Sequence, residues 1–249
     1  MHEFVRAIHW IFTASHWDTV NFQTGIRAQL AYHVELSALS LLFAAGLAIP
    51  VGLLVGHKRR GQFLAVSVAN VGRSIPSFAL VVLAFIIISN LWPRLGFSML
   101  PTLVALTLLG IPPILTNTYV GIQSVDPDTV ESVRGMGMNE RQVLFRLEVP
   151  VAAPLIMAGL RTSAVTVVAT ATLAGFVGGG GLGVFLYGGF AQRGQEAQLI
   201  GGAILVAALA VLTEVSFAGL ERVVTPKALS GRASKRRARS PGSEAIPAA

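Results

Sequence analysis

Residues 126–150 read DPDTVESVRGMGMNERQVLFRLEVP, a polar stretch that separates two long apolar segments of the chain. Asp126 can cap a short helix, with Pro127 at its first position, where a missing N–H costs nothing. Gly135 or Gly137 suits the left-handed residue that commonly ends a helix. The first half of this stretch therefore predicts a short helix followed by a turn.

The second half of the stretch carries its own helix signals. Asn139 can cap a second helix, and Gln142, three residues later, completes the spacing of a capping box. Pro150 then marks the start of the next apolar segment. The apolar stripe of this second helix consists of Val143, Leu144 and Leu147. Together the two halves predict a helix–turn–helix elbow with one apolar and one charged face.

Five apolar segments around the elbow are long enough to cross a membrane, which takes about 20 helical residues. They are Val34–Gly56, Phe63–Ser89, Met99–Ile122, Val151–Val177 and Ala197–Leu220. Lipid offers no hydrogen-bond partners, so backbone groups in each segment must be satisfied within a helix. We therefore predict an all-α integral membrane protein with five transmembrane helices.

The composition supports this class and excludes others. Hydrophobic residues make up 53% of the 249 residues and charged residues 12%, about half the charged share of a soluble domain. The chain has no cysteine, which excludes disulfides, thiolate catalysis and cysteine-bound metals. The net charge of +7 is concentrated in runs beside apolar segments, a distribution typical of membrane topology signals rather than of a nucleic-acid-binding face.

Lysine and arginine residues in alternate loops predict the orientation in the membrane. Thirteen lie at 57–61, at 123–150 and after residue 221, whereas four lie in the loops on the other side. Cytoplasmic loops carry the excess of such residues. We therefore predict an external N-terminus and a cytoplasmic C-terminus, with the elbow in the cytoplasm of a multi-pass protein of the cell membrane.

The two ends of the chain differ from its centre. Residues 1–26 contain Trp10 and Trp17 and predict an external segment at the membrane interface. His2, His9 and His16 recur every seven residues, but a wet polar helix face explains them better than a metal site, because histidines two turns apart cannot easily share one ion. Residues 27–220 form the membrane domain. Residues 221–249 predict a basic, disordered cytoplasmic tail.

The elbow resembles a motif of the permease subunits of type I ABC importers. That motif reads Glu-Ala-Ala, three residues, Gly, nine residues, Ile-x-Leu-Pro. Here Glu131-Ser132-Val133, Gly137 and Leu147-Glu148-Val149-Pro150 keep every interval. The substitutions exchange small for small and aliphatic for aliphatic residues. The resemblance covers about residues 25–220 and implies the MetI-like permease fold.

Segments outside the elbow narrow the resemblance to the osmoprotectant branch, which takes up glycine betaine, carnitine, choline or proline. The segments that carry it are Arg73–Ala79, Gly110–Ile114, Gly159–Thr162, Ala174–Phe176 and Gly178–Gly183. Methionine-type permeases are the relatives most easily confused with this branch. The elbow motif therefore implies the class of transporter, and the resemblance to the osmoprotectant branch implies the class of solute.

The resemblance implies that the elbow is a coupling helix, which docks into a cleft of a separate ATPase subunit. Glu131 would be the docking carboxylate, Gly137 the turn, and Val130 and Val133 apolar contacts with that partner. The full set of implied docking residues is Val130, Glu131, Ser132, Val133, Gly137, Asn139, Leu147 and Pro150. Further implied partners are a second ATPase copy, a second permease (identical or homologous) and an extracytoplasmic solute-binding protein.

The chain should not bind ATP phosphates itself, since it contains no Gly-x-x-x-x-Gly-Lys-Ser/Thr sequence. We therefore expect no cofactor and no metal in this chain, no catalytic residue, and Mg-ATP only on the partner. Gly178-x-Gly180-x-x-Gly183 matches a dinucleotide-binding pattern but lacks the strand and βαβ unit that this chemistry needs. We interpret it as a flexible external loop, followed by a short returning helix at Leu182–Phe190.

The candidates for a solute path are Arg73, Pro76, Asn117, Tyr119 and Arg161. Arg73 and Arg161 lie inside apolar segments, where an unpaired cation costs at least about 2.5 kcal/mol. Each can snorkel, pair with an acid or line a water-filled path; for Arg73 a structural contact near Pro76 is favoured over solute contact. No aromatic cage for a quaternary ammonium group can be recognised, so we expect tight recognition in the separate binding protein.

Three other functions remain as alternatives. An ABC permease for another small solute, such as an amino acid, would keep the elbow and differ in the solute. An ion-coupled carrier would need carboxylates buried in mid-membrane, yet Glu35 and Glu214 lie near segment ends. An intramembrane enzyme would need paired catalytic side chains at membrane depth, and none is recognisable.

Overall fold

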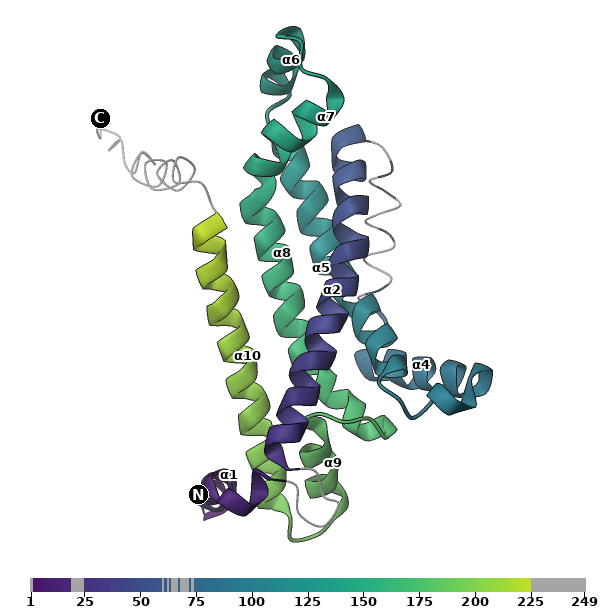
Figure 1. The fold of residues 1–249 in the computed structure, drawn as a ribbon, viewed down its shortest axis with the longest axis vertical. Coiled ribbons are helices and arrows are strands. Elements are labelled where there is room, and N and C mark those ends of the chain that lie inside the picture. The colour runs from purple at the N-terminus through teal and green to yellow at the C-terminus, as the bar shows by residue number, and fades with distance from the viewer. Residues whose placement is uncertain are drawn as a thin grey trace, which may run out of the picture.

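The computed structural model describes residues 2–18, 25–59, 61, 63, 67, 72 and 74–224, and these contain helices and no strand. Within them, four helical runs are long and apolar enough to cross a membrane. They are α2 (Ile26–Lys58), α5 (Leu100–Gln123), the run Glu140–Val177 that contains α8 (Val149–Thr170), and α10 (Glu196–Val224). All four extend along the long axis of the molecule (Figure 1).

These runs contain four of the five predicted spans, which confirms an all-helical membrane architecture. Of the 27 residues of the second predicted span, Phe63–Ser89, eight lie outside the described residues. From residue 77 onward this span belongs to α4 (Ser77–Leu91), whose 15 residues are fewer than the roughly 20 that a crossing takes. In Figure 1, α4 runs across the bundle rather than along it. The number of five spans therefore stays a prediction.

The core forms where α5 packs between α2 and α8. Gly52 and Gly56 of α2 lie one turn apart on the face toward α5. A Cβ atom on Gly52 would lie 2.7 Å from Cβ of Thr118, and one on Gly56 would lie 2.7 Å from Cβ of Ile122. Such small residues let two membrane helices approach closely, which increases their dispersion contacts.

The second elbow helix differs from the prediction, because it is not separate from the following span. Helix α7 (Glu140–Val143) continues through a π-helical turn, η3 (Leu144–Glu148), directly into α8. Pro150 is the second residue of α8 and has no N–H to complete the α-helical ladder. The wider turn just before it accommodates that missing donor, so the chain bends without ending the helix.

The end of the bundle opposite the elbow contains α1 (His2–Phe12), η1 (Ala14–His16) and α9 (Gly183–Ala191) (Figure 1). Helix α9 begins and ends within one residue of the predicted returning helix. Both α1 and α9 pack against α10, and Trp10 of α1 contacts Phe185 of α9 edge to face, with ring centroids 5.3 Å apart.

The glycine-rich loop before α9, residues 178–182, is hydrogen-bonded to α2. This finding corrects the expectation of a flexible loop. The backbone N–H of Gly181 donates to Oε1 of Gln29 at 2.6 Å, and that of Leu182 donates to Nδ1 of His33 at 3.2 Å. Since Nδ1 accepts, Nε2 carries the proton and donates to the carbonyl of Val168 in α8 at 2.9 Å. One buried histidine thus links α2, α8 and the loop.

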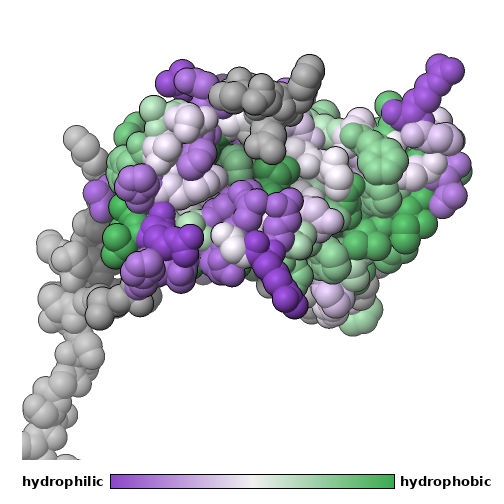
Figure 2. Space-filling model, turned by 90° about the horizontal axis from the view of Figure 1, so that it is seen from below, coloured by the Kyte–Doolittle hydropathy of each residue, from purple (hydrophilic) through white to green (hydrophobic). Residues whose placement is uncertain are grey.

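Large apolar side chains cover the outside of the bundle. Exposed examples are Leu42, Phe43 and Leu47 on α2, Leu83, Ile86 and Ile87 on α4, and Val211, Leu212 and Val215 on α10. Figure 2 looks at the end that carries α1 and α9, where hydrophilic residues gather, while hydrophobic surface appears at the sides. This distribution fits a bundle surrounded by lipid, with its ends in water.

The predicted boundaries at the two ends change slightly. Helix α10 continues to Val224, so the first four residues of the predicted tail are helical, and residues 225–249 lie outside the described residues. In the N-terminal segment, His16 stacks on Trp10 with ring centroids 5.0 Å apart, and its Nδ1 lies 2.8 Å from the carbonyl oxygen of Trp10. The side chain of His16 is therefore part of the local packing.

Candidate functional site

The elbow begins with α6 (Pro127–Gly135) and projects beyond the bundle (Figure 1). Its predicted caps are confirmed. The Asp126 carboxylate accepts from the backbone N–H of Asp128 at 3.0 Å. Asn139 and Gln142 form a reciprocal capping box, with bonds of 3.0 and 2.9 Å. Both caps satisfy N–H groups that a helix start would otherwise leave without partners.

The turn between the two helices is made by Gly137. Its φ angle is +91°, a conformation that residues with a Cβ atom rarely adopt. Of the two glycines that the sequence offered for the turn, Gly137 has the required conformation, whereas Gly135 is the last residue of α6.

The apolar stripe of the elbow packs mostly against the elbow itself. Val125, Val130 and Val143 form a buried cluster, and the partly buried residues around it are Val133, Met138, Leu147 and Val151. Val130 and Leu147 therefore contribute to the packing inside the elbow, and their role in docking stays a prediction. The exposed large apolar side chains of the elbow are instead Met136, at 75%, and Phe145, at 57%. The sequence did not indicate them, because periodicity does not show which neighbour covers an apolar stripe.

The remaining predicted docking residues lie on the outside of the elbow. Glu131, Ser132, Asn139 and Pro150 are exposed, and the hydroxyl of Ser132 donates to the carbonyl of Asp128 at 2.7 Å. Within the described residues, the Glu131 carboxylate makes no ion pair. Glu131, Met136 and Phe145 thus present one acid and two apolar side chains on the exposed surface of the elbow.

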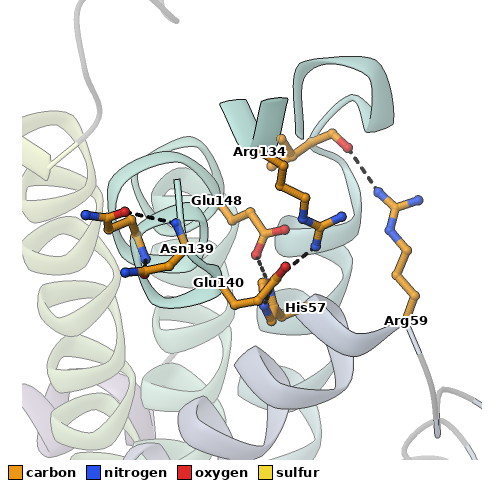
Figure 3. A network of polar contacts seen from close by, with 8 residues as sticks. His57, Arg59, Arg134, Asn139, Glu140 and Glu148 are labelled. Carbon is orange, nitrogen blue, oxygen red and sulfur yellow. Dashed lines mark hydrogen bonds and ion pairs between the residues drawn. The ribbon is translucent and has the colours of Figure 1, made fainter. Parts of the chain in front are cut away.

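A polar network behind this surface ties the elbow to the end of α2 (Figure 3). Nδ1 of His57 lies 2.6 Å from Oε2 of Glu148, and Nε2 lies 3.0 Å from Oε2 of Glu140. The same Glu140 oxygen accepts from Nη2 of Arg134 at 2.8 Å. This hydrogen bond raises the pKa of the Arg134 guanidinium above its ordinary value, so Arg134 stays charged.

A second link joins the same helix end to the end of α5. Arg59 caps α2 in the left-handed conformation, with a φ angle of 50°, and its Nη2 donates to the carbonyl of Val125 at 3.3 Å. Between the end of α2 and α6 lies a cavity of about 510 Å³. Its lining residues are His57, Lys58, Arg59, Pro127, Val130, Glu131, Arg134 and Glu148.

Of the five candidates for a solute path, four lie among the described residues. Arg73 lies outside the described residues, and Pro76 is the exposed residue before α4. Asn117 of α5 donates to the carbonyl of Pro113 in its own helix at 2.8 Å. Tyr119, also on α5, is 6% exposed.

Arg161 pairs with acids, which was one of its three alternatives. Its Nε lies 3.4 Å from Oε1 of Glu214, and its Nη1 donates to Oε2 of Glu221 at 3.0 Å. Both acids belong to α10, so Arg161 joins α8 to α10. An arginine in a span is costly when unpaired, and this pairing offsets that cost.

Comparison with known proteins identifies relatives over most of the chain. Residues 48–228 match the family described as "Binding-protein-dependent transport system inner membrane component". The chain is 38% identical over 199 residues to the glycine betaine/carnitine/choline transport system permease protein OpuCB of Bacillus subtilis, which covers 80% of this chain and 88% of that protein. It is 39% identical to the carnitine transport permease protein OpuCB of Listeria monocytogenes, over 79% of this chain and 87% of that protein.

More distant similarities point the same way. The osmoprotectant import permease protein OsmW of Salmonella typhimurium is 31% identical, over 85% of this chain and 99% of that protein. Among solved structures, the MetNI methionine ABC transporter in an inward-facing conformation has a chain that superposes with a TM-score of 0.71. That match covers 81% of this chain and 96% of the other at 22% identity, and it shows that the two share a fold.

Proposed function

Since the chain belongs to the family of binding-protein-dependent transport system inner-membrane components, we propose that it is the permease subunit of an ATP-driven importer for osmoprotectants with quaternary ammonium groups. The relatives that cover about four-fifths of the chain carry glycine betaine, carnitine and choline in their names. The agreement among these names is the main support for the proposal. The osmoprotectant branch also includes proline permeases, so proline is a further candidate solute.

The elbow supports the ATP-driven part of the proposal. It is a capped, internally packed unit that projects beyond the bundle, and Glu131, Met136 and Phe145 are exposed on it. Exposed apolar side chains are often found on surfaces that bind another protein. The partners are an ABC ATPase in two copies, a second permease, identical or homologous, and an extracytoplasmic solute-binding protein. Hydrolysis of Mg-ATP belongs to the ATPase.

The ion-coupled carrier is the weaker alternative on the described residues. The carboxylates of their long helices lie at helix ends or are exposed: Glu35 is exposed, and Glu214 is paired with Arg161. Glu148, the one buried carboxylate of the described residues, belongs to the elbow network. A proton- or sodium-coupled carrier uses buried acids at membrane depth, and the described spans offer none.

Uptake experiments test the proposal. Cells lacking this chain, with and without a plasmid copy, are given radiolabelled choline, glycine betaine, carnitine or methionine. We expect the plasmid to restore uptake of at least one quaternary ammonium solute and not of methionine, and vanadate to block that uptake. Uptake that continues without ATP but stops when the proton gradient is collapsed would favour the carrier. Restoration of methionine uptake alone would overturn the solute class.

A further inference from the structure

Three aromatic side chains from separate parts of the chain meet at the end of the molecule opposite the elbow. Phe78 is the second residue of α4, Phe176 lies in the short helix η4 (Ala171–Val177), and Tyr187 lies in α9. The ring of Phe176 contacts the ring of Phe78 edge to face, with centroids 6.2 Å apart, and the ring of Tyr187 in the same way, with centroids 5.6 Å apart. We call Phe78, Phe176 and Tyr187 the ring cluster.

The ring cluster leaves much of its aromatic surface uncovered. The exposed fractions are 48% for Phe78, 39% for Phe176 and 48% for Tyr187. The faces of aromatic rings carry partial negative charge, so they attract an organic cation that approaches them. The cluster therefore combines apolar surface with an attraction for positive charge, although none of its three residues is an acid.

Two glycines hold two of the three rings next to each other. A Cβ atom on Gly175 would collide with the backbone of Gly183, and one on Gly183 would collide with the backbone of Thr172, so η4 and α9 are in backbone contact. Phe176 directly follows Gly175, and Tyr187 lies four positions after Gly183, which is about one helical turn. The two rings are thus arranged before any ligand arrives, which reduces the entropy lost on binding.

The ring cluster also coincides with segments that the sequence analysis connected with solute. Phe78 lies in Arg73–Ala79 and Phe176 in Ala174–Phe176, and both segments carry the resemblance to the osmoprotectant branch. Pro76, a candidate for the solute path, lies two positions before Phe78. The sequence did not indicate the cluster itself, because Phe78 and Phe176 are 98 positions apart.

We propose that the ring cluster is a binding site for the quaternary ammonium group of the solute. This inference rests on the proposed function and names the part of the chain that contacts the solute. Glycine betaine, carnitine and choline all carry a trimethylammonium group, whose methyl groups contact the rings while its charge is attracted by their faces. Each exposed ring contributes little, so the site binds weakly and releases the solute readily, as a transport path requires.

The test measures the dissociation constant of choline on the complex purified through a tag on this chain, without the solute-binding protein. Saturation-transfer NMR detects the methyl protons of weakly bound choline, and a titration gives the constant. The neutral analogue, in which a tert-butyl group replaces trimethylammonium, has the same shape and should bind more weakly than choline. Leucine keeps the apolar bulk and removes the ring, so Phe176→Leu and Tyr187→Leu should each weaken choline binding about two- to five-fold.

Three control variants separate loss of the ring from damage to the fold. Phe190→Leu changes a side chain of the same helix α9 that is 77% exposed and is not among the ring pairs of the described residues, and it should bind choline as the wild type does. Phe176→Tyr keeps the ring and should retain binding. If Phe176→Leu fails to fold, Phe78→Leu, at the start of α4, carries the same prediction.

The outcomes distinguish this inference from the proposed function. Equal dissociation constants for choline in the wild type and the leucine variants of the ring cluster would overturn the inference. Equal binding of choline and its neutral analogue to the wild type would overturn it as well, because the rings would then provide only apolar surface. A wild-type complex that binds choline through the rings yet shows no ATP-driven choline uptake would instead overturn the proposed function.

Discussion

Gly137 determines how the two halves of the elbow are joined. Its φ angle is +91°, and a Cβ atom placed there would meet nothing within 4 Å. The cost of any other residue at this position is therefore a backbone cost, because left-handed conformations are unfavourable by about 1–2 kcal/mol for residues with a side chain. Gly135, two positions earlier, also has open space around it, and it is not among the residues with positive φ.

This difference gives a matched pair of substitutions. Gly137→Val should tilt α7 away from α6 and reduce the amount of ATPase that stays bound to the purified chain. Gly135→Val adds the same side chain at the end of α6 and should keep the ATPase. The ratio of ATPase to permease on a stained gel measures the effect, and immunoblots of the membranes control for insertion. Equal retention in the two variants would refute the role of the Gly137 conformation.

Sequence patterns predicted those residues of the elbow that act locally. Asp126, Asn139 and Gln142 were identified because a cap and its target lie within three positions of one another. His57 and Glu148 were missed, since no local spacing connects two residues 91 positions apart. The periodicity of Val130 indicates that its side chain is covered but not that Val125 and Val143 cover it, and its role in docking stays a prediction.

The packing of α2 on α5 depends on two glycines. Gly52 and Gly56 lie so close to α5 that an added Cβ atom would stand 2.7 Å from Cβ of Thr118 or Ile122. Carbon atoms do not approach to that distance, so a side chain there must push the helices apart. Gly46, on the same helix, has nothing within 4 Å of the corresponding position.

We expect Gly52→Ala to destabilise the bundle by about 1–3 kcal/mol, as overpacking of a core does. Gly46→Ala should be neutral or slightly stabilising, because alanine favours the helix more than glycine does. The temperature at which half of the detergent-solubilised protein aggregates measures the difference. A Gly52→Ala variant as stable as Gly46→Ala would show that α2 and α5 are not packed as described.

The length of the apolar segments predicted the four long helices well, because a membrane span must have a certain length and must be helical. The length of the apolar segments could not predict that α7 continues into α8. No amino-acid pattern marks the π-helical turn before Pro150 that joins them. Segment length also could not show that Gln29 and His33 fasten the loop at Gly181 and Leu182. These bonds join residues 152 and 149 positions apart, which no local spacing connects.

The two ends of the molecule differ in structure. One end carries the elbow and the ends of α2 and α10, and the other carries α1 and α9 (Figure 1). The excess of cations in the loops of the elbow end led to the prediction that this end faces the cytoplasm. Single cysteines at Ser132 and at Gly180 test this orientation, since the chain has no cysteine of its own.

In intact cells, a membrane-impermeant maleimide should label the cysteine at position 180 and leave that at position 132 unlabelled. Opened membranes should show labelling at both positions. Ser132 is exposed on the elbow, so poor access cannot explain an absence of labelling once the membranes are open. Labelling of position 132 in intact cells would reverse the predicted orientation of the termini and remove the elbow from the side on which ATP is found.

The central claim is that this chain passes solute while a separate ATPase, bound to the elbow, supplies the energy. Affinity purification from the native membrane, followed by mass spectrometry of the bound subunits, measures this directly. We predict that a subunit with a P-loop purifies with the wild-type chain in about equal amount, as expected for two ATPases on two elbows.

The Glu131→Lys variant provides the contrast, since Glu131 is exposed and unpaired among the described ion pairs. It should reach the membrane in normal amount and lose the P-loop subunit, whereas Glu131→Gln, which keeps the size of the side chain, should retain part of it. A wild-type chain that restores choline uptake in cells yet purifies without any nucleotide-binding subunit would contradict the account.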